Sequence, residues 1–317
     1  MTVERTIASG ILGFPITPMN EDLSINYDSY QKNIEFLIDN GLNSVFIACG
    51  AGEFHAINEE EYEQLIIKAK EVVQNRVPIY TGVGGKITEA LKQTELSAKY
   101  GVDGYLILPP YLIDPSQDGI YAYLKTIIES TNLKAIVYQR DNCILTLDTL
   151  KKLAEIPQLV GFKDGVGNIE TNVEFTQALG DRLIWINGMP LAEVTMPTYL
   201  NIGFETYSSA ISNYIPFVSR QYFDALLSGN QEKVKQLYED VIFPINNIRK
   251  QKKGYAVSLI KAGMNIIGLP VETNVRPPIA PVEQQHYDAL AEIIKLANEK
   301  YAEGTGAKVN ANLQELH

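Results

Sequence analysis

One lysine in this sequence stands where a buried strand would be expected. Residues 159–164 read LVGFKD, and the apolar start of this run is typical of a short strand in a core. Gly165 and Gly167 follow it and indicate that the chain turns there. Lys163 is therefore expected close to the end of the strand, where a cation needs either solvent or a chemical role.

The alternation of side chains along a strand predicts where Lys163 points. It puts Leu159, Gly161 and Lys163 on one face, and Val160 and Phe162 on the other. If the bulky pair faces surrounding helices, Lys163 points into the interior of the sheet. Gly161 beneath it would leave room for the lysine stem.

A tyrosine is expected beside this lysine. In the preceding apolar run KAIVYQR, at 134–140, the same alternation sends Ile136 and Tyr138 inward. A desolvated amine has a lowered pKa and attacks ketones to form a Schiff base, and a nearby phenol can transfer the protons. The competing interpretation is a lysine that reaches solvent at a strand end, but the inward phase and the facing tyrosine favour chemistry.

Three other strand ends carry groups suited to a polar substrate. Gly50 and Gly52 follow an apolar run and could turn backbone N–H groups toward an anion, although a plain turn explains them nearly as well. Ser208 and Ser209 could hydrogen-bond a substrate or could be solvated caps. Arg140 has the phase of Tyr138 and could pair with a carboxylate, but the sequence alone favours a surface salt bridge for it.

Strands and helices alternate along the chain in a way that predicts how these residues are brought together. Eight apolar, β-branched runs recur, at 10–17, 44–50, 77–84, 104–110, 134–140, 159–165, 183–189 and 204–210, with helical periodicity between them. Eight such units predict a (β/α)8 TIM barrel over residues 1–228, whose chemistry lies at the carboxyl ends of the strands. A doubly wound sheet is the alternative, because element order alone does not show closure. Residues 229–317 are predicted to add a three-helix extension, at 230–250, 252–268 and 282–301.

Composition excludes several classes of function. A net charge of −11 argues against a nucleic-acid-binding protein, which needs a basic face. Cys49 and Cys143 lie far apart in apolar runs, the N-terminal residues carry no targeting signature, and no apolar run reaches the roughly 18 residues of a membrane span. We therefore expect a reduced, cytoplasmic protein without a membrane segment. The three histidines lack metal-ligand spacing, so no catalytic metal is expected.

Three motifs together carry a family resemblance. G-x-G-E at 50–53, a tyrosine that ends the strand at 138 and F-K-D at 162–164 resemble the dihydrodipicolinate synthase and N-acetylneuraminate lyase superfamily of Schiff-base barrels. The resemblance covers nearly the whole chain, including the three terminal helices. The stretches LVGFKDGVGNIE, YQRDN and ETYSSAISN are most similar to the branch of 5-dehydro-4-deoxyglucarate dehydratases.

The resemblance implies a role for each candidate residue. Lys163 would form the Schiff base and Tyr138 would be the proton shuttle. Gly50, Ala51 and Gly188 would contact the keto-acid end of the substrate. Ser208 and Ser209 would lie near the rest of it.

The implied reaction converts 5-dehydro-4-deoxy-D-glucarate, a keto sugar diacid, into 2,5-dioxopentanoate, carbon dioxide and water. It needs no cofactor, and the resemblance implies a homotetramer built as a dimer of dimers. A Schiff-base aldolase or synthase that acts on 2-keto-3-deoxy acids or pyruvate is the alternative, because both reactions share the imine. A non-catalytic barrel that binds sugar acids is a further one, which the paired Lys163 and Tyr138 disfavour.

The sequence departs from the superfamily pattern at two places. Gly50 and Ala51 stand where hydroxyl residues are usual, so the hydroxyl that would orient the tyrosine is missing. Residues 138–141 read YQRD in place of Tyr-Asn-x-Pro, which weakens the synthase and lyase interpretations and suits the dehydratase branch.

Overall fold

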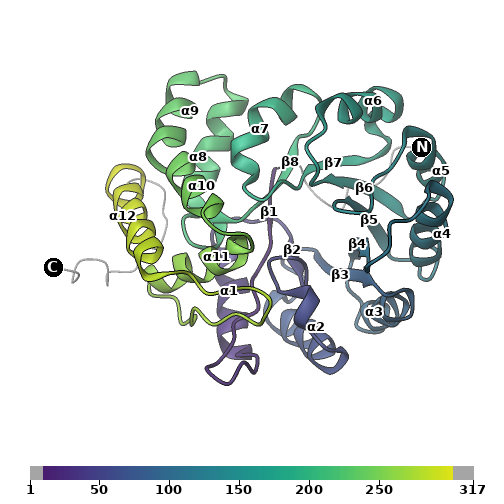
Figure 1. Ribbon diagram of the computed structural model, residues 1–317, viewed down its shortest axis with the longest axis horizontal. Coiled ribbons are helices and arrows are strands. Elements are labelled where there is room, and N and C mark those ends of the chain that lie inside the picture. Colours follow the sequence, from purple (N-terminus) through teal and green to yellow (C-terminus); the bar gives the residue numbers. More distant parts are fainter. Residues whose placement is uncertain (1–9, 303–317) are drawn as a thin grey trace.

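The chain folds around a closed barrel of eight parallel strands. The computed structural model describes residues 10–302, and in it each strand pairs with the next and β8 returns to β1 (Figure 1). The strands are β1 (Gly10–Gly13), β2 (Val45–Ile47), β3 (Ile79–Gly85), β4 (Gly104–Pro110), β5 (Lys134–Gln139), β6 (Leu159–Asp164), β7 (Ile184–Asn187) and β8 (Thr206–Ser209). The predicted barrel is confirmed, and the doubly wound sheet is excluded.

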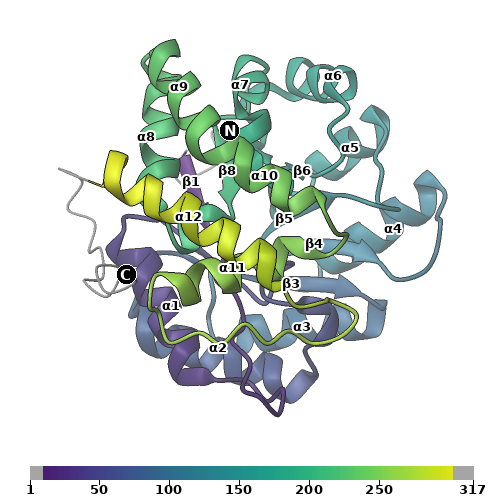
Figure 2. The same ribbon diagram turned by 60° about the vertical axis from the view of Figure 1, so that its left-hand side comes forward.

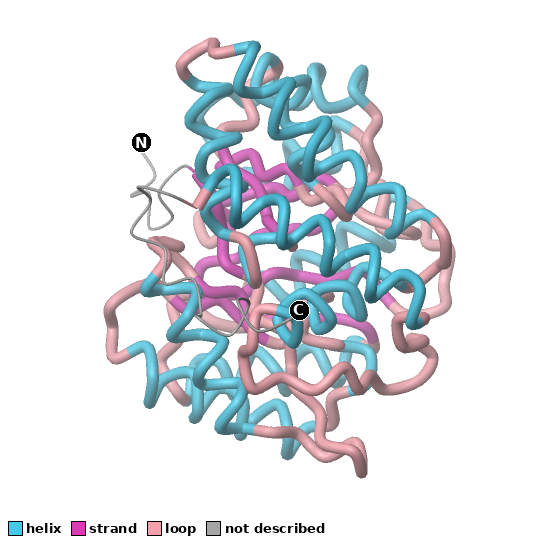
Figure 3. Tube along the Cα trace, turned by 90° about the vertical axis from the view of Figure 1, so that its left-hand side faces the viewer, coloured by secondary structure: helices cyan, strands magenta, loops and turns pink. Residues whose placement is uncertain are grey.

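A ring of helices surrounds the barrel, one after each strand (Figures 1 and 3). They are α1 (Tyr27–Asp39), α2 (Glu59–Val73), α3 (Ile87–Lys99), α4 (Gln117–Ile128), α5 (Leu147–Ala154), α6 (Ile169–Leu179), α7 (Ala192–Asn201) and α8 (Pro216–Leu227). The N-terminus of α2 is closed by a capping box, because the Asn58 side chain accepts from the N–H of Glu61 and the Glu61 side chain accepts from the N–H of Asn58.

Two apolar layers hold the barrel, one inside the strands and one between strands and helices. Inside, the rings of Phe14, Phe46 and Tyr80 stack with centroids 4.7 and 4.9 Å apart. Outside, Phe162 packs edge-on against Phe175 of α6 at 5.4 Å. Bulky side chains therefore fill the barrel as a packed core rather than a pore.

The predicted phase of β6 is correct near its end and wrong at its start. Phe162 faces the helices as expected, but Leu159 belongs to the outer layer and Val160 to the interior. The reason is a register shift between β5 and β6, in which Ala135 lies opposite Leu159 and the next residue opposite Gly161. Such a bulge inserts one residue and interrupts the two-residue alternation on which the prediction depended.

The predicted extension of three helices is present and gathers on one side of the barrel (Figure 2). Its first helix is made of α9 (Gln231–Leu237) and α10 (Phe243–Lys250), joined by a π-helical segment at Tyr238–Ile242. The other two are α11 (Tyr255–Ile266) and α12 (Gln284–Tyr301).

The extension shares an apolar core with the barrel. Side chains such as Leu259 and Ile294 pack in one cluster with Ile16 and Ile211, which follow β1 and β8. The division into domains at residue 228 stays a prediction.

Two parts of the sequence analysis fall outside the described residues. These are the N-terminal residues 1–9, predicted to carry no targeting signature, and the end of the extension at 303–317. Between residues 10 and 302, no helix is both long and apolar enough to cross a membrane.

Candidate active site

Lys163 lies inside the barrel, directly beside Tyr138. The two residues are register partners on β6 and β5, as the sequence predicted. The lysine is 5% exposed, and its Nζ lies 4.0 Å from the centroid of the Phe14 ring and 4.5 Å from that of Tyr138. In the described part of the chain, Nζ forms no ion pair with a carboxylate. The amine is therefore held by aromatic faces rather than by a counter-charge.

Room for the lysine stem comes from Gly188, not from Gly161. A Cβ atom at Gly188 would lie 2.6 Å from both Cγ and Cε of Lys163. A Cβ atom at Gly161 would instead meet Ile136, at 3.2 Å. The expectation for Gly161 was wrong because the alternation pattern describes only neighbours along one strand. The stem of Lys163 instead packs against Gly188, at the end of β7.

Burial changes the acid–base chemistry of this amine. It lowers the pKa of Lys163 from 10.5 to about 7, because the charged form loses its hydration. The nearby cation of Arg140 acts in the same direction. A large fraction of the amine is thus neutral, and nucleophilic, near neutral pH.

The phenol of Tyr138 has two fixed partners. It donates a hydrogen bond to the carbonyl oxygen of Gly188 at 3.0 Å and accepts one from Nη1 of Arg140 at 3.1 Å. Burial raises the pKa of Tyr138, while the Arg140 charge opposes that rise. Gly165 is required beside the ring, since a Cβ atom there would lie 2.7 Å from the phenol oxygen. The phenol is therefore protonated and oriented.

Arg140 takes the place of the hydroxyl that the sequence lacks at position 51. Its guanidinium orients the phenol and also lies 3.5 Å from the carboxylate of Asp141, which is largely exposed. The salt bridge expected for Arg140 thus exists, and the same side chain faces the barrel mouth. No sequence signal beyond the shared phase of residues 138 and 140 pointed to the contact with Tyr138.

The loop after β2 brings Ala51 to the barrel interior. Ala51 packs against the inner layer that contains Tyr138, and Gly50 is exposed. Within residues 10–302, no hydrogen bond is donated by the N–H groups of Gly50, Ala51 or Gly52. The Gly52 carbonyl accepts from the hydroxyl of Thr17 at 2.7 Å. These N–H groups therefore remain able to bind an anion.

The two serines of β8 face opposite sides of the strand. Ser208 pairs with Leu12 of the inner layer, and its hydroxyl lies 3.5 Å from the carbonyl oxygen of Asn187, next to Gly188. The Ser209 hydroxyl donates to the buried carboxylate of Glu193 in α7. The structure therefore brings Ser208, but not the side chain of Ser209, to the mouth that holds Lys163.

Comparison with known proteins identifies the family of this chain. The pattern of the dihydrodipicolinate synthetase family matches residues 7–297. The chain belongs to this family. Its members are enzymes, and this chain is a lyase.

Relatives support a particular branch of the family. A protein of Oceanobacillus iheyensis named "Probable 5-dehydro-4-deoxyglucarate dehydratase" is 55% identical over 94% of this chain and 97% of its own length. One of Bacillus subtilis with the same name is 56% identical over 94% of this chain and 96% of its own. A solved dihydrodipicolinate synthase from Oceanobacillus iheyensis superimposes with a TM-score of 0.85 at 28% identity, covering 92% of this chain and 96% of that one.

A buried carboxylate that the sequence analysis did not single out fixes the end of β6. Asp164 is fully buried and points away from Lys163, toward the helices. It accepts hydrogen bonds from Gln139, Asn172, Tyr199 and the N–H groups of Val166 and Gly167. Five donors hold the strand end, and with it the position of the lysine. The F-K-D motif contained this residue, but only the fold brings its donors together.

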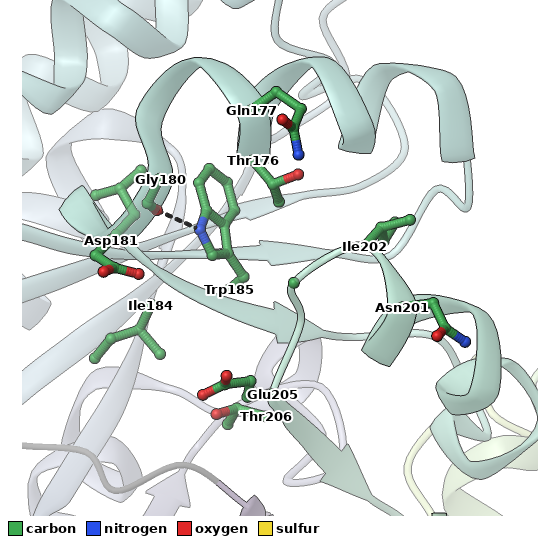
Figure 4. Close-up of a pocket in the computed structure, with 12 residues that line it drawn as sticks. Thr176, Gln177, Gly180, Asp181, Ile184, Trp185, Asn201, Ile202, Glu205 and Thr206 are labelled. Carbon is green, nitrogen blue, oxygen red and sulfur yellow. Dashed lines mark hydrogen bonds between the residues drawn. The ribbon is translucent and has the colours of Figure 1, made fainter.

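A hollow near the start of β7 and β8 is a separate feature (Figure 4). Ile184 and Thr206, the first residues of those strands, line it together with Trp185, Asp181 and Glu205. It therefore lies at the opposite end of the barrel from Lys163. Because catalytic groups of such barrels gather at the carboxyl ends of the strands, the candidate active site is the mouth around Lys163.

Proposed function

We propose that this lyase is a decarboxylating dehydratase that converts 5-dehydro-4-deoxy-D-glucarate into 2,5-dioxopentanoate, carbon dioxide and water. The observation that carries the proposal is the buried, uncompensated amine of Lys163, whose pKa is lowered to about 7, beside a protonated phenol. The names of relatives that are 55% and 56% identical support the choice of substrate.

The first step forms the imine. The neutral amine of Lys163 attacks the ketone at C2 of the substrate, numbered from the keto-acid end, and gives a carbinolamine. Tyr138 then donates a proton to the departing hydroxyl, which leaves as water, and Arg140 stabilises the phenolate that remains. The product is an iminium ion that withdraws electrons from C3.

The later steps break two bonds at the far end. A proton leaves C3, and the resulting enamine expels the C4 hydroxyl as water, which gives an iminium conjugated with a C3–C4 double bond. The C6 carboxylate then leaves C5 as carbon dioxide, and its electron pair enters the conjugated system to form a dienamine. Protonation at carbon and tautomerisation of the C5 enol give the aldehyde. Hydrolysis of the imine consumes the water released at its formation, so one water and one carbon dioxide are released overall.

The remaining candidate residues bind the two acid ends. The N–H groups of Gly50 and Ala51 have no hydrogen-bond acceptor among the described residues, and they donate to the carboxylate next to the imine. Gly188 borders the same atoms, because it touches the lysine stem and accepts from the phenol. Ser208 and Arg140 are suited to the hydroxyl groups and the distal carboxylate. The Ser209 side chain contributes indirectly, by holding the turn after β8.

Two assays test this function. Reduction with cyanoborohydride in the presence of pyruvate should attach the keto acid to Lys163, identified by peptide mass mapping. Release of carbon dioxide from 5-dehydro-4-deoxyglucarate, measured beside release of pyruvate from 2-keto-3-deoxy acids, should favour carbon dioxide. An adduct on another lysine, or none, refutes the imine. Pyruvate as the main product would establish the aldolase or synthase alternative, and ligand binding without turnover would establish the non-catalytic one.

We also propose a cytoplasmic homotetramer. An apolar tip after β4 supports association between copies, because Tyr111, Leu112 and Ile113 are 63, 85 and 59% exposed. Analytical ultracentrifugation should give a tetramer, and a monomer at all concentrations would contradict this.

A further inference from the structure

An ion pair buried between the barrel and the extension lies directly behind the loop after β2. Glu53 and Lys261 are both fully buried, and Nζ of Lys261 in α11 donates to Oε1 of Glu53. Their positions in the sequence are 208 apart, so this is a long-range contact. No step of the reaction above uses either residue.

The extension supplies all the described partners of this carboxylate. The second oxygen of Glu53 accepts from the backbone N–H of Arg276 at 2.8 Å, and Lys261 also donates to the carbonyl oxygen of Asn274 at 2.7 Å. Arg276 is itself anchored on the barrel side, where its guanidinium binds the carboxylate of Glu61 in α2. The ion pair and its hydrogen bonds thus connect α11 and the segment at 274–276 to the loop.

The loop after β2 needs these contacts because its backbone is strained. Ala48 and Glu53 have φ values of 49° and 57°, a left-handed conformation that residues other than glycine rarely adopt. Between them, Gly52 folds back so closely that a Cβ atom would lie 3.2 Å from the backbone of Ala48. The same turn, residues 48–53, carries the N–H groups of Gly50 and Ala51.

We propose that Glu53 and Lys261 are positioning residues, which hold the backbone of Gly50 and Ala51 in the geometry that binds the carboxylate beside the imine. The inference rests on the proposed function. It gives the extension a part in the active site, through the loop after β2. Loss of the pair releases the turn, and carboxylate binding weakens while the amine of Lys163 keeps its reactivity.

The test compares a charged with a neutral ketone. Hydroxyacetone matches the size of pyruvate but carries no carboxylate, so its trapping on Lys163 by cyanoborohydride does not depend on the loop. The variant Glu53→Gln/Lys261→Met removes both charges together, which avoids leaving one buried charge alone. Lys252→Met is the matched control, because it removes an exposed ion pair of the extension, between Lys252 and Glu283, that does not include Glu53 or Lys261.

The expected result is a change in selectivity. In the double variant, the pyruvate concentration that gives half-maximal trapping rises by at least tenfold, while the maximal rate and the trapping of hydroxyacetone stay within twofold of wild type. The Lys252→Met protein behaves like wild type with both ketones. Unchanged pyruvate dependence, or an equal loss with both ketones, overturns the positioning role. If the wild-type protein itself forms no adduct at Lys163, the proposed function is refuted. This outcome differs from the two results that overturn the positioning role.

Discussion

In the described part of the chain, two lysines are deeply buried, and their surroundings are opposite. Lys261 is 0% exposed and meets a carboxylate and a carbonyl oxygen, whereas Lys163 is 5% exposed and meets the faces of two aromatic rings. Burial lowers the pKa of both amines. At Lys261 the carboxylate of Glu53 opposes this effect, whereas at Lys163 the opposing group is the Cys49 thiol and the nearby Arg140 adds to the lowering.

The difference separates a structural lysine from a reactive one. A buried charge needs a partner, and an amine without one becomes neutral more readily. The paired Lys261 binds a carboxylate and fixes two elements together. The unpaired Lys163 is poised to lose its proton and to act as a nucleophile. Burial alone therefore does not point to a catalytic lysine, whereas burial without a counter-charge supports the role proposed for Lys163.

The largest expected effect comes from replacing the unpaired lysine. Lys163→Met keeps the volume and removes the nucleophile, so turnover should fall by roughly 10⁴ to 10⁶. Because no carboxylate loses its partner, the free energy of unfolding should be unchanged or higher. Steady-state kinetics and urea unfolding check both parts. Retained turnover would show that Lys163 only packs the barrel.

Removal of the phenol beside Lys163 should have the next largest effect. Tyr138→Phe keeps the ring that contacts Nζ and deletes the hydroxyl, so turnover should fall by roughly 10² to 10⁴, as for a positioned acid–base group. Adduct formation with pyruvate should also slow, because loss of water from the carbinolamine needs the same proton. Tyr105→Phe is a control, since its hydroxyl bonds to α4 outside the barrel. Wild-type turnover in the Tyr138 variant would place the proton relay elsewhere.

The paired lysine should show the reverse of the Lys163 result. Lys261→Met leaves the Glu53 carboxylate buried without its cation, which should lower the free energy of unfolding by about 3 to 5 kcal/mol. Adding Glu53→Gln should recover most of that loss, as a double-mutant cycle in urea will measure. Equal stability of Lys261→Met and wild type would contradict the assignment of Lys261 as structural.

The sequence predicted the parts of this site that depend on local pattern. Alternation along β5 and the end of β6 sufficed to bring Tyr138 and Lys163 together, since strand neighbours in a parallel barrel follow from element order. The bulge at Leu159 and Val160 could not be predicted from the sequence, because it depends on the pairing of β6 with β5.

The partners that tune the site could not be predicted in the same way. Gly188 beside the lysine, Arg140 on the phenol and Lys261 behind Glu53 are contacts between elements. Lys261 in particular reads as an ordinary residue of an apolar helix. Only the packing of that helix against the loop after β2 distinguishes it from an exposed lysine.

The smallest expected effect is a difference in pH dependence, and it tests the lowered pKa directly. Competitive acetylation with acetic anhydride, followed by mass mapping, reports the neutral fraction of Lys163 against a lysine peptide in the same tube. With a pKa of about 7, its reactivity should rise about tenfold from pH 6 to pH 8 and then level off, whereas the peptide should rise roughly 100-fold without levelling.

The same pKa also predicts the sign of a stability change. Between about pH 7 and the usual lysine pKa near 10.4, the unfolded chain holds a proton that folded Lys163 does not. Stability should therefore rise with pH across this window, and Lys163→Met should lose that part of the rise. A Lys163 reactivity that follows the peptide up to pH 10 would mean that the amine is compensated after all, and the distinction from Lys261 would disappear.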